Sequence, residues 1–416
     1  MPDTGTQENV SPFNWESGKW NHPSDKSDSI EIMISGDWAP IRKFESIIST
    51  DPTAIYGDLL PELQKCDLCI TNLECPLTMS ETAPAKSGTV FKGLPHHVSA
   101  LQVANFSIVT TANNHVFDFG EEGFSETHRV LAENNILSVG SGFSHEMASI
   151  PLVTKIGEIK LGIVNFSEGE DLKAAEGDKA GVFGWEIDRV KEIVKNLRSQ
   201  VDCILVIVHC GVEYIPFPPP YVVEAFQQVA DCGADLVIGH HPHVPQGIQI
   251  HGSTPLCYSL GNYIFYQETD LLYRKIGYMV KAAFSKNGLK GIEVIPYEIG
   301  NQALKMLTGE RRKWFFELLE EISNPLNTRK GTLEAWYGFL AWYGKKGFVS
   351  EVNRLLYQME KDPKKGAAMF RNRVTTMQHS QHWTDALTRI IDDTIDQAPD
   401  WSLELQDRYF ATRIKT

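Results

Sequence analysis

Residues 201–243 read VDCILVIVHCGVEYIPFPPPYVVEAFQQVADCGADLVIGHHPH and contain a complete strand–helix–strand unit. Two continuous apolar runs, CILVIVH (203–209) and LVIGHH (236–241), flank a helical window over 220–232. Apolar runs without alternation are typical of strands that are buried on both faces. This order predicts two parallel strands joined by a right-handed crossover helix, with histidines at both strand ends.

The same pattern extends towards the N-terminus. Further helical windows cover 121–135 and 186–199, and four more apolar runs are IEIMIS (30–35), LCITNLE (68–74), FSIVTTA (106–112) and KLGIVNF (160–166). Beyond residue 243 the pattern changes to hairpins, with a Gly-Ser turn in 246–260 and an Asn-Gly turn in 278–299. The sequence therefore predicts an α/β fold in which strands and helices alternate.

Side chains that bind metals follow several of these runs. They are Asp37, Asn72 and Glu74, Asn114 and His115, His209, and the pair His241 and His243. Open α/β sheets bind ligands at the carboxyl ends of their strands, so the fold is expected to gather these residues in one place. Mixed nitrogen and oxygen ligands suit Mn, Fe or Zn. The pattern predicts a two-metal hydrolytic site.

Composition narrows the class of protein. Residues 1–300 contain 21 Lys+Arg against 38 Asp+Glu, whereas residues 301–416 contain 18 against 15. An acidic main part offers no basic stripe for a nucleic acid. Seven cysteines and a polar N-terminus without an apolar run favour a reducing compartment, and no window is long enough for a membrane span. We expect a cytoplasmic protein with neither nucleic-acid nor membrane partners.

Three parts are expected along the chain. Residues 1–29 are rich in Ser, Asp, Asn and Pro and predict a flexible arm, and residues 30–300 form the main α/β domain. Residues 301–416 predict a helical extension, with helical windows over 310–323, 331–343, 349–360 and 381–396. Two interpretations of this extension stay open: an appendage that packs its aromatic side chains on the main domain, or a lid or partner surface.

Six motifs together resemble the CapA-type poly-γ-glutamate capsule synthesis family. They are GDWAPIR (36–42), DLCITNLECPLT (67–78), TANNHVFDFG (111–120), VHCGVEY (208–214), GADLVIGHHPHVPQG (233–247) and YSLGNYIF (258–265). The resemblance covers about residues 30–270 and implies a calcineurin-like metallophosphoesterase-type sandwich, in which helices flank mixed sheets. The helical extension lies outside the resemblance.

The resemblance also implies a set of metal ligands. One divalent metal would be held by Glu74, Asn114, His209 and His241, and the other by Asp37, Glu74 and His243. The wider superfamily has a histidine two residues after its first aspartate, whereas this chain has Ala39. The second site therefore lacks one protein ligand and is expected to be weak or empty.

Three functions follow from this pattern. The first is metal-dependent hydrolysis of a phosphoester, or of an amide in a peptide or polyglutamate-like substrate, with His115 as general acid oriented by Asp118. The second is a metal-free peptide or amino-acid epimerase, with Asp37, Glu74 and His115 among its acids and bases. The third is a non-catalytic component of capsule synthesis.

Several further residues are candidates for substrate binding. Arg42 has the side chain to hold a carboxylate or phosphate through two hydrogen bonds, although a surface ion pair is an equal alternative. The other candidates are Asn72, Lys92, Glu213, Tyr214 and Asn262, for which structural roles in packing, turns or solvated loops stay open.

Overall fold

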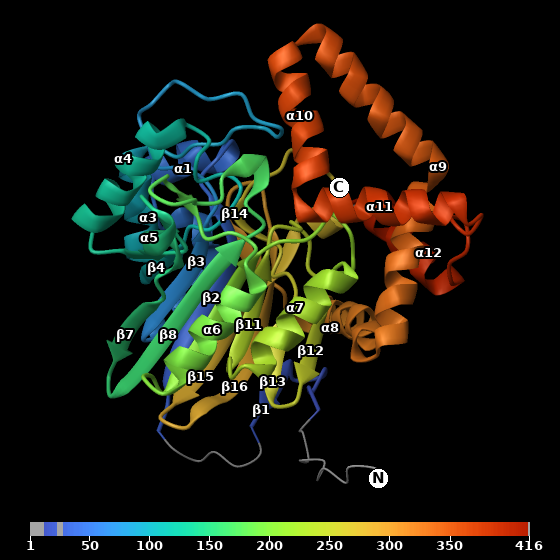
Figure 1. Cartoon of the computed structure of the whole chain (residues 1–416). Coiled ribbons are helices and arrows are strands. Elements are labelled where there is room, and N and C mark those ends of the chain that lie inside the picture. Colours follow the sequence, from blue (N-terminus) through green and yellow to red (C-terminus); the bar gives the residue numbers. More distant parts are fainter. Residues whose placement is uncertain (1–11, 23–27, 415–416) are drawn as a thin grey trace.

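The computed structural model describes residues 12–22 and 28–414 of the chain. Two large mixed sheets pack against each other, and helices cover the two outer faces (Figure 1). A further group of helices follows at the C-terminal end of the chain. The expected α/β sandwich of mixed sheets flanked by helices, with a C-terminal helical extension, is confirmed.

The first sheet has the strand order β1-β16-β15-β2-β3-β4-β5, with β14 beside β2 and β17 beside β16. Its half from β2 to β5 is parallel, and the half from β15 to β1 is antiparallel. The strands are β1 (Lys19–Asn21), β2 (Ile30–Ala39), β3 (Leu68–Leu73), β4 (Phe106–Thr110), β5 (Leu137–Val139), β14 (Asn262–Phe265), β15 (Ile276–Ser285), β16 (Gly288–Ile299) and β17 (Leu304–Met306).

The second sheet has the order β12-β13-β11-β10-β8-β7. Strands β8, β10, β11 and β13 are parallel, so the crossover predicted between 203–209 and 236–241 is present. The strands are β7 (Leu152–Ile156), β8 (Ile159–Ser167), β10 (Cys203–His209), β11 (Leu236–His240), β12 (Ile248–His251) and β13 (Thr254–Cys257). A small separate sheet pairs β6 (Ser141–Gly142) with β9 (Gly181–Val182).

The main core lies between the two large sheets. Ile32 and Ile34 of β2 share an apolar cluster with Ile163 of β8 and Ile207 of β10. Successive residues of a strand point to opposite faces, so Met33 lies in a second apolar cluster under the helices. Both faces of β2 are therefore buried, which explains its unbroken apolar run.

Helices cover the outer face of each sheet. On the first sheet, α1 (Lys43–Thr50), α2 (Leu60–Lys65), α3 (Val98–Val103) and α4 (Gly120–Glu133) contribute to the second cluster. On the second sheet, α6 (Ile187–Arg198) and α7 (Pro220–Asp231) contact the central strands, and α5 (His145–Ser149) lies near β8. Short 3-10 turns cover Ala54–Leu59, Pro95–His97, Glu170–Leu172, Leu272–Arg274 and Asn324–Asn327.

The C-terminal extension consists of α8 (Gly309–Ser323), α9 (Arg329–Lys361), α10 (Pro363–Thr375), α11 (Met377–Ile391) and α12 (Asp400–Ala411). The predicted break near 344 is a kink inside α9, where Gly344 has φ 57° and ψ −178°. Helix α9 ends at Lys361 and α10 begins at Pro363, because proline is well tolerated in the first helical turn. In Figure 1, α10 stands beside the long loop that follows β3.

The described part of the predicted N-terminal arm belongs to the first sheet. Strand β1 pairs antiparallel with β16, and Trp20 is buried in the main core. Residues 12–22 therefore form an edge strand with its lead-in. Residues 1–11 and 23–27 lie outside the described residues.

Two properties bear on the surroundings of the protein. Among the described helices, none has the length and apolar character that crossing a bilayer requires. All seven cysteines have free thiols, including Cys66 and Cys69. A cytoplasmic location stays a prediction.

Candidate functional site

The polar residues predicted from the strand ends lie together where the two sheets meet. Asn72 connects the sheets, because its Nδ2 atom lies 2.8 Å from Asp37 Oδ1 and 3.2 Å from His209 Nδ1. The amide of Asn113 donates to Asn72 Oδ1 over 3.1 Å and so fixes the turn after β4. The carboxyl ends of parallel strands thus place ligands from both sheets in one buried cluster.

The turn after β11 is strained in a way that places two histidines. His241 and His243 have φ values of 100° and 58°, which non-glycine residues rarely adopt. A Cβ at Gly239 would lie 2.0 Å from the carbonyl oxygen of Tyr258, so only glycine fits before the histidines. Such backbone strain is characteristic of functional sites.

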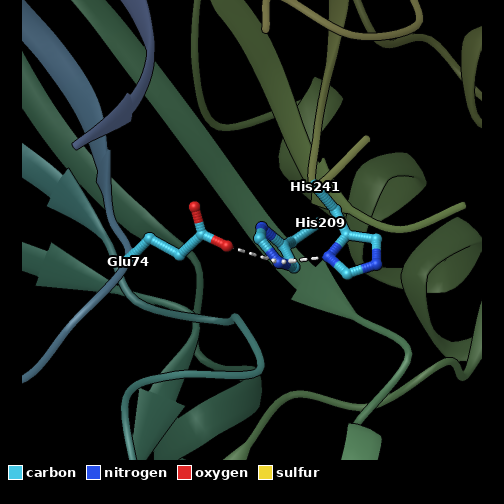
Figure 2. Close-up of side chains that lie close together, drawn as sticks. All are labelled: Glu74, His209 and His241. Atoms are coloured by element: carbon cyan, nitrogen blue, oxygen red, sulfur yellow. Dashed lines mark hydrogen bonds and ion pairs between the residues drawn. The ribbon is translucent and has the colours of Figure 1, made fainter. Parts of the chain in front are cut away.

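The first predicted ligand set is assembled around His209. His209 Nε2 lies 3.6 Å from Glu74 Oε1, 3.0 Å from His241 Nδ1 and 3.0 Å from Asn114 Oδ1. Figure 2 shows Glu74, His209 and His241 pointing towards one another from three different segments. Their ligand atoms all lie within 4.8 Å of one another, which is suitable spacing around one cation.

The second predicted set shares Glu74 with the first. His243 Nε2 lies 3.6 Å from Glu74 Oε1, and His243 Nδ1 lies 3.5 Å from Asp37 Oδ2. A third group of suitable spacing joins Glu213 to His241 and His243. Glu213 was expected among the substrate-binding residues, and its position makes it a further possible metal ligand.

Glu74 shows that a divalent cation fits this cluster. Its side chain is fully buried, yet neither carboxylate oxygen has a hydrogen-bond partner among the described residues. Burial raises the pKa of Glu74 well above its usual value, and the nearby Asp37 carboxylate raises it further. Burial and the adjacent His241 together lower the pKa of His209 well below its usual value. A cation between these groups would relieve both the orphaned carboxylate and the crowded imidazoles.

Ala39 lies in apolar surroundings, at the position where the resemblance implied a histidine in the wider superfamily. Ala39 is fully buried in the cluster that also contains Trp38 and Ile41. No side chain at this position supplies a ligand, as the sequence indicated.

Asp37 has a neighbour that sequence reasoning left out. His240 Nδ1 lies 3.1 Å from Asp37 Oδ1, and the ring is buried. Burial opposes the ionised form of Asp37, but His240 and His243 outweigh it, so the pKa of Asp37 lies well below its usual value. His240 pairs with His209 in the parallel register of β10 and β11. This register could have indicated that His240 lies beside the other strand-end residues.

Two amide side chains orient the histidine ligands from behind. Asn262 Oδ1 lies 2.9 Å from His243 Nδ1, while Gln378 Oε1 lies 3.1 Å from His241 Nε2. The Gln378 amide also donates to Glu170. An amide oxygen accepts a hydrogen bond from a ring N–H, so Gln378 keeps the proton of His241 on Nε2 and leaves Nδ1 free as a ligand.

A second cluster of charged residues lies beside the ligands. His115 Nδ1 lies 2.7 Å from Asp118 Oδ2, the contact expected for an oriented imidazole. Lys86 Nζ lies 2.5 Å from Asp118 Oδ1 and 3.1 Å from His115 Nδ1. Burial lowers the pKa of His115, against an opposing effect of Asp118. Lys86 was missed because it lies in a loop without a pattern.

The family model for the bacterial capsule synthesis protein PGA_cap matches residues 31–267, which include all the predicted ligands. This chain belongs to the PGA_cap family. The PGA biosynthesis protein CapA of Bacillus subtilis (strain 168) is 26% identical over 295 residues, covering 69% of this chain and 77% of that protein. The capsule biosynthesis protein CapA of Bacillus anthracis is 24% identical over 309 residues, covering 72% and 75%.

Solved structures show more distant likeness. A 5'-nucleotidase precursor from Thermus thermophilus is 13% identical with a TM-score of 0.42, covering 72% of this chain and 59% of that chain. The NAD nucleotidase of Haemophilus influenzae is 16% identical with a TM-score of 0.40, covering 70% and 56%.

Five of the predicted substrate-binding residues of this PGA_cap protein fall into two groups. Arg42, Glu213 and Tyr214 line a cavity of about 740 Å³ that also exposes Asn114, His115 and His243. Asn72 and Asn262 are buried behind the ligands and hold Asp37 and His243 instead.

Lys92 does not line this cavity and is a loop lysine, the alternative that the sequence left open. Its Nζ atom donates to the carbonyl oxygen of Ser80 over 2.9 Å and pairs with Glu81 at 2.7 Å, outside the cavity wall. Lys86, six residues earlier, is the lysine of this loop that enters the site, because Asp118 provides a buried partner.

Proposed function

We propose that this chain is a metal-dependent hydrolase of the PGA_cap family, acting on a phosphoester or on an amide of a peptide or polyglutamate-like substrate. One observation carries the proposal: Glu74 is a buried carboxylate without a hydrogen-bond partner among the described residues, and it lies between two sets of histidine ligands. A buried carboxyl group without hydrogen bonds is costly to ionise, and a cation is the partner for which these ligands are suited.

The spacing of the side chains supports the two ligand sets that the resemblance implied. Glu74, Asn114, His209 and His241 would hold one divalent metal, and Asp37 with His243 would hold a second, sharing Glu74. A bound metal would polarise a phosphoryl or carbonyl oxygen and make water more acidic. The second set lacks a ligand because Ala39 replaces a histidine. The metal held by Glu74, Asn114, His209 and His241 is therefore expected to bind more tightly than the second metal. Nitrogen and oxygen ligands favour Mn, Fe or Zn.

His115 is the residue we assign to proton transfer. Asp118 and Lys86 both contact its Nδ1 atom, so Nε2 is the ring nitrogen left for the cavity. In the protonated ring Nδ1–H donates to Asp118, and the Nε2 proton can move to the leaving group, which leaves a neutral ring that Asp118 still holds. Phe91 N donates to Asp118 over 2.7 Å and holds that carboxylate in turn.

The proposed substrate class follows from the names of the relatives and from the chemistry of the reacting group. The Bacillus relatives are named for PGA and capsule biosynthesis, which supports a polymer or oligomer of glutamate. Phosphoester cleavage is the alternative within the same chemistry, since a phosphoryl and a carbonyl oxygen need the same stabilisation.

The test starts from protein purified without chelators. Elemental analysis should find Mn, Fe or Zn, and the protein should hydrolyse bis-p-nitrophenyl phosphate or poly-γ-glutamate until a chelator is added. Glu74→Gln should lose both the metal and the turnover, whereas Glu81→Gln, in the exposed loop, should retain both. Full turnover by protein that contains no metal would contradict the proposal.

A metal-independent proton transfer next to a carbonyl is the second candidate. It is favoured by Ala39, which leaves the second ligand set short of one residue. In deuterated water an epimerase would incorporate deuterium at a substrate Cα atom, and a hydrolase would not. Retention of the biological role by Glu74→Gln would instead support a non-catalytic component of capsule synthesis.

A further inference from the structure

The C-terminal helices form one wall of the cavity that contains the metal ligands. Arg354 of α9, Lys365 and Arg373 of α10, and Gln378 and His379 of α11 all line it. These residues lie outside the span 31–267 that matches the family model. The site is therefore completed by a part of the chain that the family match does not include.

This wall is fixed to the main domain at the site itself. Asn372 Nδ2 donates to Glu170 Oε2 over 3.2 Å, and the backbone N–H of Asp171 donates to Asn372 Oδ1 over 3.1 Å. Gln378 contacts the ligand His241, and Lys365 Nζ donates to the carbonyl oxygen of Gly88. These hydrogen bonds join α10 and α11 to three separate segments of the main domain.

Positive charge is concentrated on the cavity surface. The lining contains six cationic residues, Arg42, Lys86, Arg274, Arg354, Lys365 and Arg373, against three carboxylates, Glu170, Glu213 and Glu268. Four of the six cations lie beyond residue 267. Three of them, Arg354, Lys365 and Arg373, belong to residues 301–416, which carry a net positive charge, whereas residues 1–300 are acidic.

Two of these guanidinium groups have no carboxylate within ion-pair distance in the part of the chain that the structure describes. Arg274 stacks on the ring of Tyr214, with 3.6 Å between Cζ and the ring centroid. Arg42 donates to the carbonyl oxygen of Tyr266 over 2.7 Å. Both residues line the cavity, so their remaining N–H donors are available to a ligand.

On the wall formed by the C-terminal helices, a single carboxylate serves two arginines. Glu351 Oε1 lies 2.8 Å from Arg373 Nε and 3.6 Å from Arg354 Nη2. The other oxygen of Glu351 accepts hydrogen bonds from Tyr343 and Trp383. Protein carboxylates therefore compensate only part of the positive charge on this wall.

We propose that Arg274, Lys365 and Arg373 form an oxyanion-binding subsite, which receives a carboxylate or phosphate group of the substrate remote from the bond that is cleaved. This inference rests on the proposed function, which gives the location of the reacting bond. It adds that the substrate carries a negative charge away from that bond. Guanidinium groups bind carboxylate and phosphate through paired N–H donors, and the partial burial of the cavity strengthens such contacts. A neutral substrate would leave Arg274 and Lys365 without a carboxylate partner among the described residues, and Arg373 with only the carboxylate that it shares with Arg354.

Binding measured without turnover tests this subsite. Isothermal titration of chelator-treated protein, and of protein reloaded with Mn²⁺, should use two probes: inorganic phosphate and the dipeptide γ-glutamylglutamate. Arg274→Gln, Lys365→Gln and Arg373→Gln should each weaken binding of the preferred probe about tenfold, the size expected for one charge-assisted hydrogen bond. Tighter binding of phosphate assigns the subsite to a phosphoryl group, and tighter binding of the dipeptide assigns it to a carboxylate.

Lys364→Gln is the matched control. Lys364 is the exposed neighbour of Lys365 on α10 and does not line the cavity, so its variant should bind both probes like the wild type. Arg373 also pairs with Glu351, so circular dichroism must show that its variant is folded; if it is not, Arg274→Gln and Lys365→Gln decide the question.

The outcomes separate this inference from the proposed function. Unchanged affinity in Arg274→Gln and Lys365→Gln, or a wild type that binds neither probe, overturns the subsite even if hydrolysis is observed. Weaker binding in these variants supports the subsite even if the wild type hydrolyses nothing, in which case the proposed function fails alone.

Discussion

The side-chain oxygen of Gln378 lies 3.1 Å from Nε2 of His241, so a residue of the C-terminal helices fixes a candidate metal ligand of the α/β domain. Gln378 is buried at the start of α11 and is held in turn by Glu170. Because this contact selects the ring nitrogen that carries the proton, the helical extension would influence the binding of a metal at His241.

Replacement of Gln378 should therefore weaken the metal site. Gln378→Leu removes the acceptor for His241 Nε2, and loss of such an outer contact typically lowers metal affinity about 10- to 100-fold. Competition titration with a chromogenic chelator and Zn²⁺ would measure the change. Gln381→Leu, which loses only the contact with Asp385 on the same helix, should bind Zn²⁺ normally. Equal affinities in the two variants would show that the contact has no such role.

Glu74→Gln should have opposite effects on stability with and without metal. In chelator-treated protein the substitution removes an unsatisfied buried carboxylate, so it should raise the free energy of unfolding by ~1–3 kcal/mol. With added Mn²⁺ or Zn²⁺ the wild type gains stability from metal binding and the variant gains less. Thermal melts with and without metal measure both differences. Destabilisation of the metal-free protein by Glu74→Gln would contradict this account of Glu74.

Lys86→Met should change the pH dependence of turnover. The Lys86 ammonium group is one of the influences that lower the pKa of His115, although burial is the largest. Removing that positive charge raises the pKa of His115, so the corresponding limb of the pH–rate profile should move to higher pH. Lys92→Met is the control, because Lys92 pairs with Glu81 outside the cavity and should leave the profile unchanged. Identical shifts in both variants would rule out a specific role for Lys86.

Acid should destabilise the fold through a histidine far from the ligands. Burial lowers the pKa of His128 to about 4. A histidine in the unfolded chain has a pKa of about 6.5, so between pH 6.5 and 4 the unfolded state binds more protons than the folded state. The stabilising effect of neutral His128 is therefore complete above pH 6.5 and decreases, by up to ~1.4 kcal/mol per pH unit, as the pH falls towards 4.

Urea unfolding at pH 7, 6 and 5 would measure this effect. His128→Gln should lose less stability between pH 7 and 5 than the wild type, since glutamine does not titrate. An equal loss in both proteins would show that protonation of His128 does not contribute.

The sequence was sufficient for the architecture of the main domain. Strands buried on both faces, such as 203–209 and 236–240, have an unambiguous apolar pattern, and polar ligands at their ends stand out against it. Family motifs then supplied the division into two ligand sets around Glu74. The spacing of Glu74, His209 and His241 agrees with one of these sets, and the spacing of Asp37, Glu74 and His243 agrees with the other.

Other contacts depend on long-range packing and could not be predicted. Lys86 and Lys92 lie in the same loop, and only the buried Asp118 distinguishes the one that enters the site. Nothing local indicates that Gln378 lies against His241, 137 residues away in the chain.

The sequence by itself determined the strands, the residues at their ends and the family, because burial periodicity and short motifs are local properties. Only the tertiary structure decided that Glu213 joins the histidines, that Asn72 and Asn262 hold ligands, and that Arg274 and Arg373 face the same cavity. These relationships depend on how separate elements pack, and packing is set by contacts between residues distant in the chain.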